Sequence, residues 1–369
     1  MSKTIKTQRK IIALLMAIVM VLLTSVTAFA DSADDWEDYE YIESGKYIYM
    51  ILQNGTAQIE YYTGDETSVE IPATLDGYVV TSIDFAAFAD LENLASITIP
   101  DTVTGIGGYA FEGTAYYNDA SNWTDGVLYI GDFLIVADPE IVFGEYTIKE
   151  GTKVIADYAF NSCIDLTGVI IPDSVVTIGI SSFAWDAQLT NVKIGNGVKV
   201  ICDSAFMLCE SLTSITIPES VVLIEDFVFA GCDALKDIYI YNKDCYIIDN
   251  SIELEYEEDE EPINGWTIPE NTVIHGYAGS TAEDYANRFD REFEVIESAK
   301  GDINGDNQIT IVDAKWILKY VAGTKDLDAA QKIAADLNGD GKISTVDAKW
   351  VLQIIAGTRD AVTLEPIKK

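Results

Sequence analysis

The stretch L-T-S-I-T-I-P-E-S-V-V-L-I-E-D-F-V-F-A-G-C runs from Leu212 to Cys232 and carries the pattern that decides the fold. A related unit begins at Leu166, where the apolar residues Val169 and Ile171 alternate with polar ones and a proline follows. Such alternation predicts a short strand, and the proline closes the strand in a turn. Each unit is therefore expected to be a strand, a turn and a compact return.

This unit recurs along the chain with a period of 23 residues. The positions that keep the period are Phe88 and Phe111, then Phe160, Phe183, Phe206 and Phe229, together with isoleucines at 99, 148, 171, 194, 217 and 240. The spacing from Phe111 to Phe160 is 49 residues, which one insertion explains. A single unit cannot bury its own apolar face, so the units must stack and their ends must be capped. The sequence predicts a solenoid.

Three segments outside the regular units suggest how the stack begins, is interrupted and ends. Tyr47 to Ile71 alternates around Asn54-Gly55, which predicts a hairpin that caps the N-terminal end. Gly126 to Ile135 predicts a second hairpin, which we expect to project from the stack. Thr281 to Phe293 predicts a short closing helix with Thr281 as its N-cap. The acidic stretch that follows Asp249 is interpreted as a solvated loop.

Beyond the solenoid, residues 301–357 contain a second internal repeat, of 34 residues. Oxygen-bearing side chains recur at positions 1, 3, 5, 9 and 12 of two loops. These residues are Asp302, Asn304, Asp306, Thr310 and Asp313, matched by Asp336, Asn338, Asp340, Ser344 and Asp347. Position 7, Gln308 or Lys342, can offer a backbone carbonyl. This spacing wraps oxygen ligands around a hard cation, so the sequence predicts two Ca²⁺ ions.

Each loop leads directly into an amphipathic stretch and has no full helix before it. The apolar residues Trp316, Ile317, Tyr320 and Val321 lie on one helical face, and the second copy has the same spacing. Gly323 and Gly357 are expected to end these helices. Position 12 is Asp where a standard EF-hand has Glu. The C-terminal part is therefore predicted to be a small α-helical module built on two EF-hand-like loops.

Charge and the N-terminal sequence restrict the class of protein. Lys6, Arg9 and Lys10 precede an apolar run and an A-x-A site ending at Ala30, so residues 1–30 are predicted to be a secretory signal peptide. The formal net charge of −38 opposes binding to nucleic acid and to anionic membranes. We expect no membrane span in the mature protein, which is placed outside the cell or at its surface.

Cysteine and histidine usage gives little support to catalysis or to a disulfide framework. Cys163, Cys209 and Cys232 fall on one position of the repeat, which favours buried apolar contacts over bridges. His275 is the single histidine, which argues against Ser-His-Asp and Cys-His chemistry. Counting cannot decide whether paired carboxylates are present, because there are 61 Asp and Glu residues. No catalytic residue is predicted.

Two family resemblances follow from these motifs. The unit L-x-x-I-x-I-P-x-x-V-x-x-I followed by A-F-x-x-C resembles the leucine-rich repeats of BspA-like bacterial surface proteins. The duplicated loop and helix resemble a type I dockerin module. The resemblances imply a mainly β, leucine-rich-repeat-like solenoid over residues 31–296, followed by an α-helical dockerin with two calcium loops and a tail over 297–369.

The resemblance to dockerins implies a partner, a cohesin module of a scaffolding protein, as in cellulosomes that degrade plant polysaccharides. Carried over from that family, the cohesin contacts are Ile311, Val312 and Lys319 in the first half and Thr345, Val346 and Gln353 in the second. The duplication raises the hypothesis of binding in two orientations.

We interpret the protein as a secreted, non-catalytic binding or adhesion component, with a polysaccharide-degrading accessory protein or a structural spacer as alternatives. Exposed aromatic residues would stack on wall sugars or on a protein; the candidates are Tyr116, Tyr117, Trp123 and Trp185.

Overall fold

The structure, a computed structural model, describes residues 41–249, 266–296, 300–304, 308–327, 329–359 and 364. The chain divides into two compact units, one comprising residues 1–238 with 244–273 and the other residues 239–243 with 274–369. The predicted signal peptide and nearly all of the acidic stretch after Asp249 lie outside the described residues. The predicted boundary between 296 and 297 stays a prediction.

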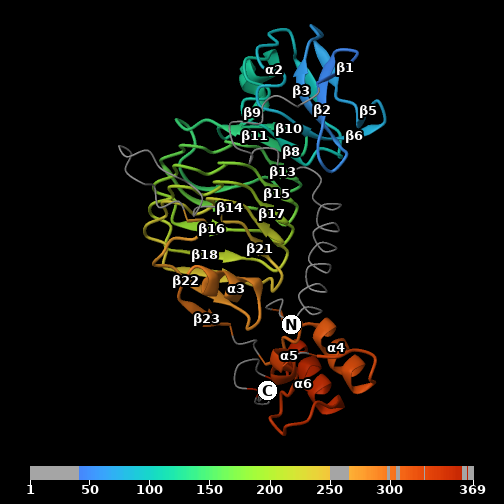
Figure 1. Cartoon of the computed structure of the whole chain (residues 1–369), viewed down its shortest axis with the longest axis vertical. Helices are drawn as coiled ribbons and strands as arrows, with labels where there is room; N and C mark the ends of the chain where they lie inside the picture. The colour runs from blue at the N-terminus through green and yellow to red at the C-terminus, as the bar shows by residue number, and fades with distance from the viewer. Residues whose placement is uncertain are drawn as a thin grey trace, which may run out of the picture. The chain divides into compact units, whose positions relative to one another are not determined.

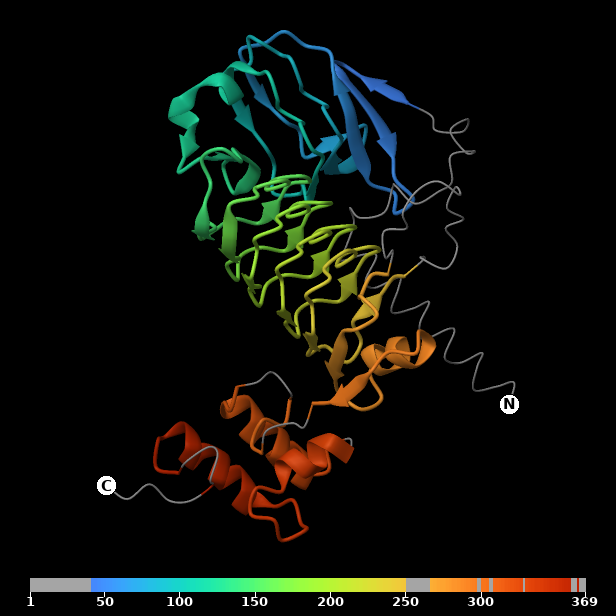
Figure 2. The same cartoon turned by 90° about the vertical axis from the view of Figure 1, so that its left-hand side faces the viewer.

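The first unit is a solenoid whose coils each contribute two short strands (Figures 1 and 2). One face carries β12 (Gly144–Thr147), β14 (Leu166–Ile170), β16 (Asn191–Lys193) and β18 (Ser214–Ile217), and β20 (Asp237–Ile240) follows along the chain. The other face carries β13 (Val154–Ile155), β15 (Thr177–Ile178), β17 (Val200–Ile201), β19 (Leu223–Ile224) and β21 (Tyr246–Ile247). Along this second face the strands pair in parallel with a shift of 23 residues, for example Val154 with Thr177. The predicted β-solenoid is confirmed.

The N-terminal end of the stack is closed by an antiparallel meander, as predicted. Its strands are β1 (Ile42–Ser44), β2 (Tyr47–Ile51) and β3 (Ala57–Tyr62). The next strands are β4 (Ser68–Glu70), β5 (Thr74–Leu75), β6 (Tyr78–Ile83), β7 (Ser96–Thr98) and β8 (Gly105–Ile106). Because β3 pairs in parallel with β6, with Ile59 opposite Ile83, the last strand of the cap is also the first rung of the solenoid.

The insertion does not project from the stack, so that expectation was wrong. It contains α2 (Ala115–Asn118), a 3₁₀ turn (Ala120–Asn122), β9 (Trp123–Thr124), β10 (Val127–Ile130) and β11 (Phe133–Ala137). Strands β10 and β11 form the expected hairpin, but β11 then pairs in parallel with β13 and continues the sheet. The physical reason is burial: Leu128, Ile130 and Leu134 are at most 2% exposed, and these apolar side chains gain more inside the core than in a projecting hairpin.

The interior is organised by a column of phenylalanine rings. Phe160, Phe183 and Phe206 are fully buried, and neighbouring centroids lie 5.1 and 5.3 Å apart with planes within 11° of parallel. Phe229 continues the column at 5.9 Å, and Phe88 stacks on Phe111 at 5.4 Å. The 23-residue period of the sequence is thus the vertical repeat of this column.

The turn that carries each Ala-Phe pair adopts an unusual backbone conformation twice in every coil. Positive φ values occur at two positions four residues apart, and they are occupied mostly by residues other than glycine. The residues are Ala86, Asp90, Tyr109, Tyr158, Ser162, Ser181, Trp185, Ser204, Leu208 and Phe227. Hydrogen bonds between coils offset the cost of this conformation, because N–H groups such as those of Tyr158 and Phe160 donate to carbonyls of the next coil at 2.8 and 2.7 Å.

Cys163, Cys209 and Cys232 are fully buried and form no disulfide, as their shared position in the repeat predicted. Asp186 takes the place of cysteine in the ladder that contains Cys163 and Cys209. Its side chain is fully buried, and neither carboxyl oxygen has a well-formed hydrogen bond. Burial raises the pKa of Asp186 to about 9, so the carboxyl group is neutral at pH 7.

A row of half-buried or buried carboxyl groups follows the short strands of the second face. Burial raises the pKa of Asp203 to about 6, of Asp157 to about 7 and of Glu225 to about 8. Glu225 accepts a hydrogen bond from the Asp203 backbone N–H at 3.0 Å. Desolvation is the leading cause at every site, and neighbouring carboxylates add to it.

The second unit contains a small cap made of β22 (Val273–Gly276), α3 (Thr281–Arg288) and β23 (Phe293–Val295). The predicted closing helix is present, but its N-cap is Ser280, whose hydroxyl accepts the Glu283 N–H at 3.2 Å, and not Thr281. The helix also ends before Phe293, which lies in β23 beside β22. His275 stacks on Tyr239 with centroids 4.2 Å apart, which gives the single histidine a packing role.

Removing one ring from the phenylalanine column should destabilise the solenoid strongly. We expect Phe183→Ala to lower the free energy of unfolding by about 3–5 kcal/mol, because a buried ring is lost and a cavity is left. Phe143 is 77% exposed, so Phe143→Ala is the matched control and should change little. Denaturant unfolding followed by circular dichroism measures both, and equal effects would contradict the interpretation of the column.

The row of carboxyl groups should make the solenoid more stable in mild acid. Each group has a folded pKa above its unfolded value, so the folded state holds protons that the unfolded chain releases. Stability should therefore fall as the pH rises from about 4 to about 8, the range between ordinary carboxyl pKa values and that of Glu225. Thermal unfolding midpoints between pH 5 and pH 9 measure this slope. Glu225→Gln should flatten it, whereas the exposed control Glu210→Gln should leave it unchanged.

Candidate functional site

The second predicted calcium loop, residues 336–347, lies wholly within the described residues. Asp336 Oδ1 and Asn338 Oδ1 both accept the Asp340 N–H, at 3.1 and 3.0 Å. Asn338 Nδ2 donates to Asp340 Oδ2 at 3.0 Å. The side chains at loop positions 1, 3 and 5 are therefore neighbours, linked to one another by hydrogen bonds.

Positions 9 and 12 of both loops form the N-terminal cap of the following helix. Ser344 Oγ accepts the Val346 N–H, and Asp347 Oδ2 accepts the Ser344 N–H at 2.9 Å, which together make a capping box. Thr310 and Asp313 repeat this arrangement in the first loop. The loop and the helix are thus joined by the same two side chains.

The position 12 carboxylates also close their loops. Asp313 Oδ1 accepts the N–H groups of Ile303 and Asn304 at 2.8 and 3.1 Å, and Asp347 Oδ1 accepts that of Asn338 at 3.3 Å. Both carboxylates are fully buried. Asp replaces the longer Glu of a standard EF-hand here, and the shorter side chain reaches the backbone of its own loop.

The remaining predicted ligands are placed in part. Asp302 is buried, and Asn304 and Gln308 are described, whereas Asp306 lies outside the described residues. In the second loop the Lys342 N–H donates to Asp340 Oδ1 at 2.8 Å, so the backbone at position 7 adjoins position 5. The arrangement of these residues around a cation stays a prediction.

The donor set fits calcium in chemical type. Side-chain oxygens alone supply positions 1, 3, 5, 9 and 12, and calcium takes six to eight such oxygens. Among the described residues, no three His, Cys, Asp or Glu side chains are already gathered as a metal-binding group. The carboxylate oxygens of the second loop accept backbone N–H groups instead. The two sets of six ligands therefore stay predictions.

The two loops lead into a pair of packed helices, α4 (Ile311–Val321) and α6 (Thr345–Ile355), with α5 (Ala329–Ala335) between them in the chain (Figure 1). The core of this module is small. It consists of Ile303, Ala314, Ile317, Leu327, Ala335, Leu337, Ala348 and Val351. Residues of both loops, Ile303 and Leu337, lie in that core, so loop geometry and helix packing depend on each other.

The outer faces of α4 and α6 expose apolar side chains at matching positions. Val312 and Val346 are 40% and 46% exposed, and Ile311 is 56% exposed. The predicted contacts Lys319 and Thr345 are exposed as well, whereas Gln353 is half-buried and accepts a hydrogen bond from Arg359 Nε at 3.0 Å.

Sequence reasoning missed one matched pair on this surface. Leu318 and Leu352, 34 residues apart, are each 44% exposed. The duplication could have identified them in the sequence. An apolar residue that lies outside the buried helical stripe in both halves indicates a surface that binds a partner. Together with Val312 and Val346, these leucines give each helix the same set of exposed apolar positions.

In both halves a basic side chain lies over the ring of the helix tryptophan. Lys325 Nζ lies 3.5 Å from the Trp316 ring centroid, and the Arg359 guanidinium lies 3.6 Å from that of Trp350. These contacts tie the segment after each helix back onto the helix. The two halves thus share their loops, their exposed apolar residues and their C-terminal contacts.

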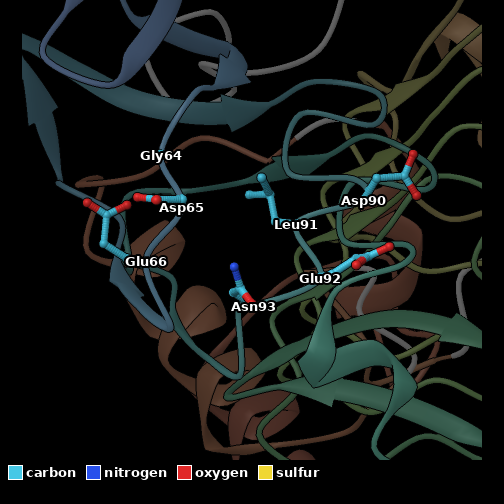
Figure 3. A pocket seen from close by; sticks show the side chains of 7 residues that line it. All are labelled: Gly64, Asp65, Glu66, Asp90, Leu91, Glu92 and Asn93. Atoms are coloured by element: carbon cyan, nitrogen blue, oxygen red, sulfur yellow. The ribbon is translucent and has the colours of Figure 1, made fainter.

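The first unit has a shallow acidic hollow of about 270 Å³ (Figure 3). Its lining residues are Gly64, Asp65, Glu66, Asp90, Leu91, Glu92 and Asn93. Glu66 is engaged by Lys46 and by the Tyr62 hydroxyl at 2.6 Å. The lining residues of the hollow include no histidine, cysteine or serine, and the titratable groups among them are all carboxylates.

The geometry defines the class of protein: a leucine-rich-repeat-like β-solenoid joined to a small module with a duplicated loop and helix. The BspA type leucine rich repeat family matches residues 57–134 and 143–255 in six copies, and the type I dockerin family matches residues 300–356. The chain belongs to the BspA type leucine rich repeat family and carries a type I dockerin domain. Type I dockerin domains bind calcium, and a dockerin implies a cohesin partner.

Solved bacterial structures are similar to this chain over much of its length. A leucine rich cell surface protein from Faecalibacterium prausnitzii is 22% identical with a TM-score of 0.33, covering 58% of this chain and 94% of its own. The pneumococcal vaccine antigen PcpA is 15% identical with a TM-score of 0.36, covering 70% and 98%. No curated protein matches the chain. None of the helices in the described segments has the length and apolar character to cross a membrane.

Chelation should unfold the dockerin and spare the solenoid. When the free calcium concentration is 100 times the dissociation constant of a site, binding stabilises the fold by about 2.7 kcal/mol. A module with so small a core needs this additional stabilisation. Calorimetry of the full chain should therefore show one transition lowered by EDTA and another left unchanged. A trace that EDTA does not alter would refute this prediction.

Two variants separate ligand loss from general damage to the loop. Asp336→Ala should reproduce the effect of EDTA, because it removes the position 1 carboxylate. Lys342→Ala is the control, since position 7 offers only its carbonyl, and it should keep the calcium dependence.

Proposed function

We propose that this chain is a secreted, non-catalytic binding component that attaches to a cohesin-bearing scaffold through its calcium-loaded dockerin. The observation that carries the proposal is the duplicated surface on α4 and α6, where Val312, Leu318, Val346 and Leu352 are exposed beside the predicted loops. Exposed apolar residues in matching positions indicate a surface meant for a protein partner.

Two Ca²⁺ ions, one in each loop, are part of the proposal. The ligands are those named from the sequence, Asp302, Asn304, Asp306, Gln308, Thr310 and Asp313 in the first loop and Asp336, Asn338, Asp340, Lys342, Ser344 and Asp347 in the second. Support comes from the oxygen-bearing residues at positions 1, 3 and 5, which are hydrogen-bonded neighbours in the second loop. When bound, the ions would hold the loops that place α4 and α6.

The cohesin contacts proposed are Ile311, Val312 and Lys319 together with Thr345, Val346 and Gln353, extended by the leucines at 318 and 352. Support for export comes from the basic, apolar and A-x-A pattern of residues 1–30. Support for a non-catalytic role comes from the single histidine, which stacks on Tyr239.

Titration calorimetry of the full chain with cohesin modules tests the docking role. Tight binding in calcium and none in EDTA is the expected result, because the loops position both helices. Binding that persists in EDTA, or none to any cohesin in calcium, would overturn the proposal.

The duplicated surface also predicts how single-half variants behave. If cohesin can bind in two orientations, with either helix making the main contact, the Val312→Asp and Val346→Asp variants should each still bind cohesin. The double variant should not bind it. Complete loss from one single variant would show that binding has one orientation. Lys342→Ala serves as the control, because this side chain lies in the loop and not on the exposed helix face.

A further inference from the structure

A row of exposed aromatic side chains runs along one edge of the first four rungs of the solenoid. Tyr61, Phe85, Tyr109 and Tyr158 are 55%, 50%, 53% and 37% exposed. Phe85 and Tyr109 lie 5.3 Å apart between ring centroids, and Tyr109 and Tyr158 lie 6.3 Å apart. Tyr61 follows Ile59 as Phe85 follows Ile83, and these isoleucines are paired in β3 and β6, so Tyr61 extends the row by one rung.

The insertion leaves this row unbroken. Tyr109 and Tyr158 are 49 residues apart in sequence, yet the Asp157 N–H after β13 donates to the Ile106 carbonyl of β8 at 2.9 Å. The two strands are neighbours in Figure 1. The inserted hairpin therefore joins the sheet without separating the aromatic side chains.

Two glycines, Gly107 and Gly108, leave room beside the backbone for the aromatic rings. A Cβ atom on Gly108 would lie 2.5 Å from Cδ2 of Tyr158, and one on Gly107 would lie 2.4 Å from the backbone nitrogen of Phe85. A side chain at either position would displace the row. The Tyr158 ring therefore lies against the backbone of the preceding rung at Gly108.

The shape of the row selects a linear ligand. A stable protein interface buries about 800 Å² on each partner around an apolar core, and this row is one side chain wide. An extended peptide would add to a strand edge through backbone hydrogen bonds. Here the N–H groups of Ala86, Phe88 and Tyr158 already donate to the next coil and are not available to pair with a peptide.

Charge argues against an anionic ligand, because the net charge of −38 repels anionic polymers. The four side chains of the row are themselves uncharged at pH 7, which suits a neutral ligand.

We infer that the row formed by Tyr61, Phe85, Tyr109 and Tyr158 binds a neutral polysaccharide chain, whose sugar rings stack their C–H faces on successive aromatic side chains. Sugar rings that recur along an extended chain match aromatic side chains that recur on successive rungs, and their hydroxyls can hydrogen-bond to the phenol groups of the exposed tyrosines. The inference names the ligand class of the solenoid and rests on the proposed binding function.

The structure also corrects the aromatic residues expected from sequence. Tyr116, Tyr117 and Trp123 pack against the core of the solenoid, and the Trp123 indole donates to the Tyr117 carbonyl at 2.7 Å. Trp185 is 54% exposed, but it lies on the other positive-φ position of its coil and outside the row. It is therefore a control and not a member.

Affinity electrophoresis of the full chain in calcium tests the inference, with mixed-linkage β-glucan, glucomannan and xylan in the gel and insoluble cellulose in a sedimentation assay. The wild type should bind at least one of these neutral polymers and not polygalacturonate. Each of Phe85→Ala, Tyr109→Ala and Tyr158→Ala should weaken binding about two- to tenfold, the range expected for one aromatic contact. The triple variant should not bind.

Trp185→Ala and Phe143→Ala remove exposed aromatic side chains elsewhere and should bind as the wild type does. Gly108→Ala keeps every ring but displaces Tyr158, so it should weaken binding while the unfolding midpoint of the variant is checked by circular dichroism. No binding to any neutral polymer, undiminished binding by the triple variant, or equal loss in the controls would overturn the inference. Cohesin titration reads out the dockerin separately, so failure of docking and failure of the aromatic row are distinguishable.

Discussion

The stacked phenylalanine column is the constraint on which the rest of the structure depends. Rings such as Phe183 and Phe206, fully buried and 5.3 Å apart, fix the rise from one coil to the next. That rise brings N–H and carbonyl groups of successive turns within hydrogen-bonding distance, which allows a left-handed backbone at residues as large as Tyr158. The aromatic row on the surface depends on the same stacking, which places Phe85, Tyr109 and Tyr158 on successive rungs.

Much of the solenoid could be predicted because the same residue types recur in the sequence at a regular spacing. The phenylalanines at 160, 183 and 206 and the prolines after the strands gave the repeat and the turn. The insertion was harder, since a hairpin pattern around Gly131 does not say whether the hairpin packs on the stack or leaves it. Ser280 and Thr281 could each cap a helix, and only backbone geometry decides between them.

The dockerin loops were predictable because ligand spacing is a local property of the chain. The partner surface was less so: Leu318 and Leu352 look like ordinary core leucines until the helix packing shows that they face outward. The aromatic row was not predicted either. Phe85 and Tyr109 are 24 residues apart instead of the 23 of the repeat, and Tyr158 lies beyond the insertion. Their alignment exists only after the rungs are stacked, whereas Tyr116 and Trp123, adjacent in sequence to the same insertion, turn inward.

The account makes the chain a bridge between a scaffold and a polysaccharide, and co-sedimentation of a labelled cohesin module with an insoluble neutral polysaccharide tests that claim most directly. The cohesin should sediment only when the full chain and calcium are both present, and EDTA or the triple aromatic variant should each return it to the supernatant. Cohesin that stays in solution while the chain itself sediments, or that sediments equally with the triple variant, would contradict the account.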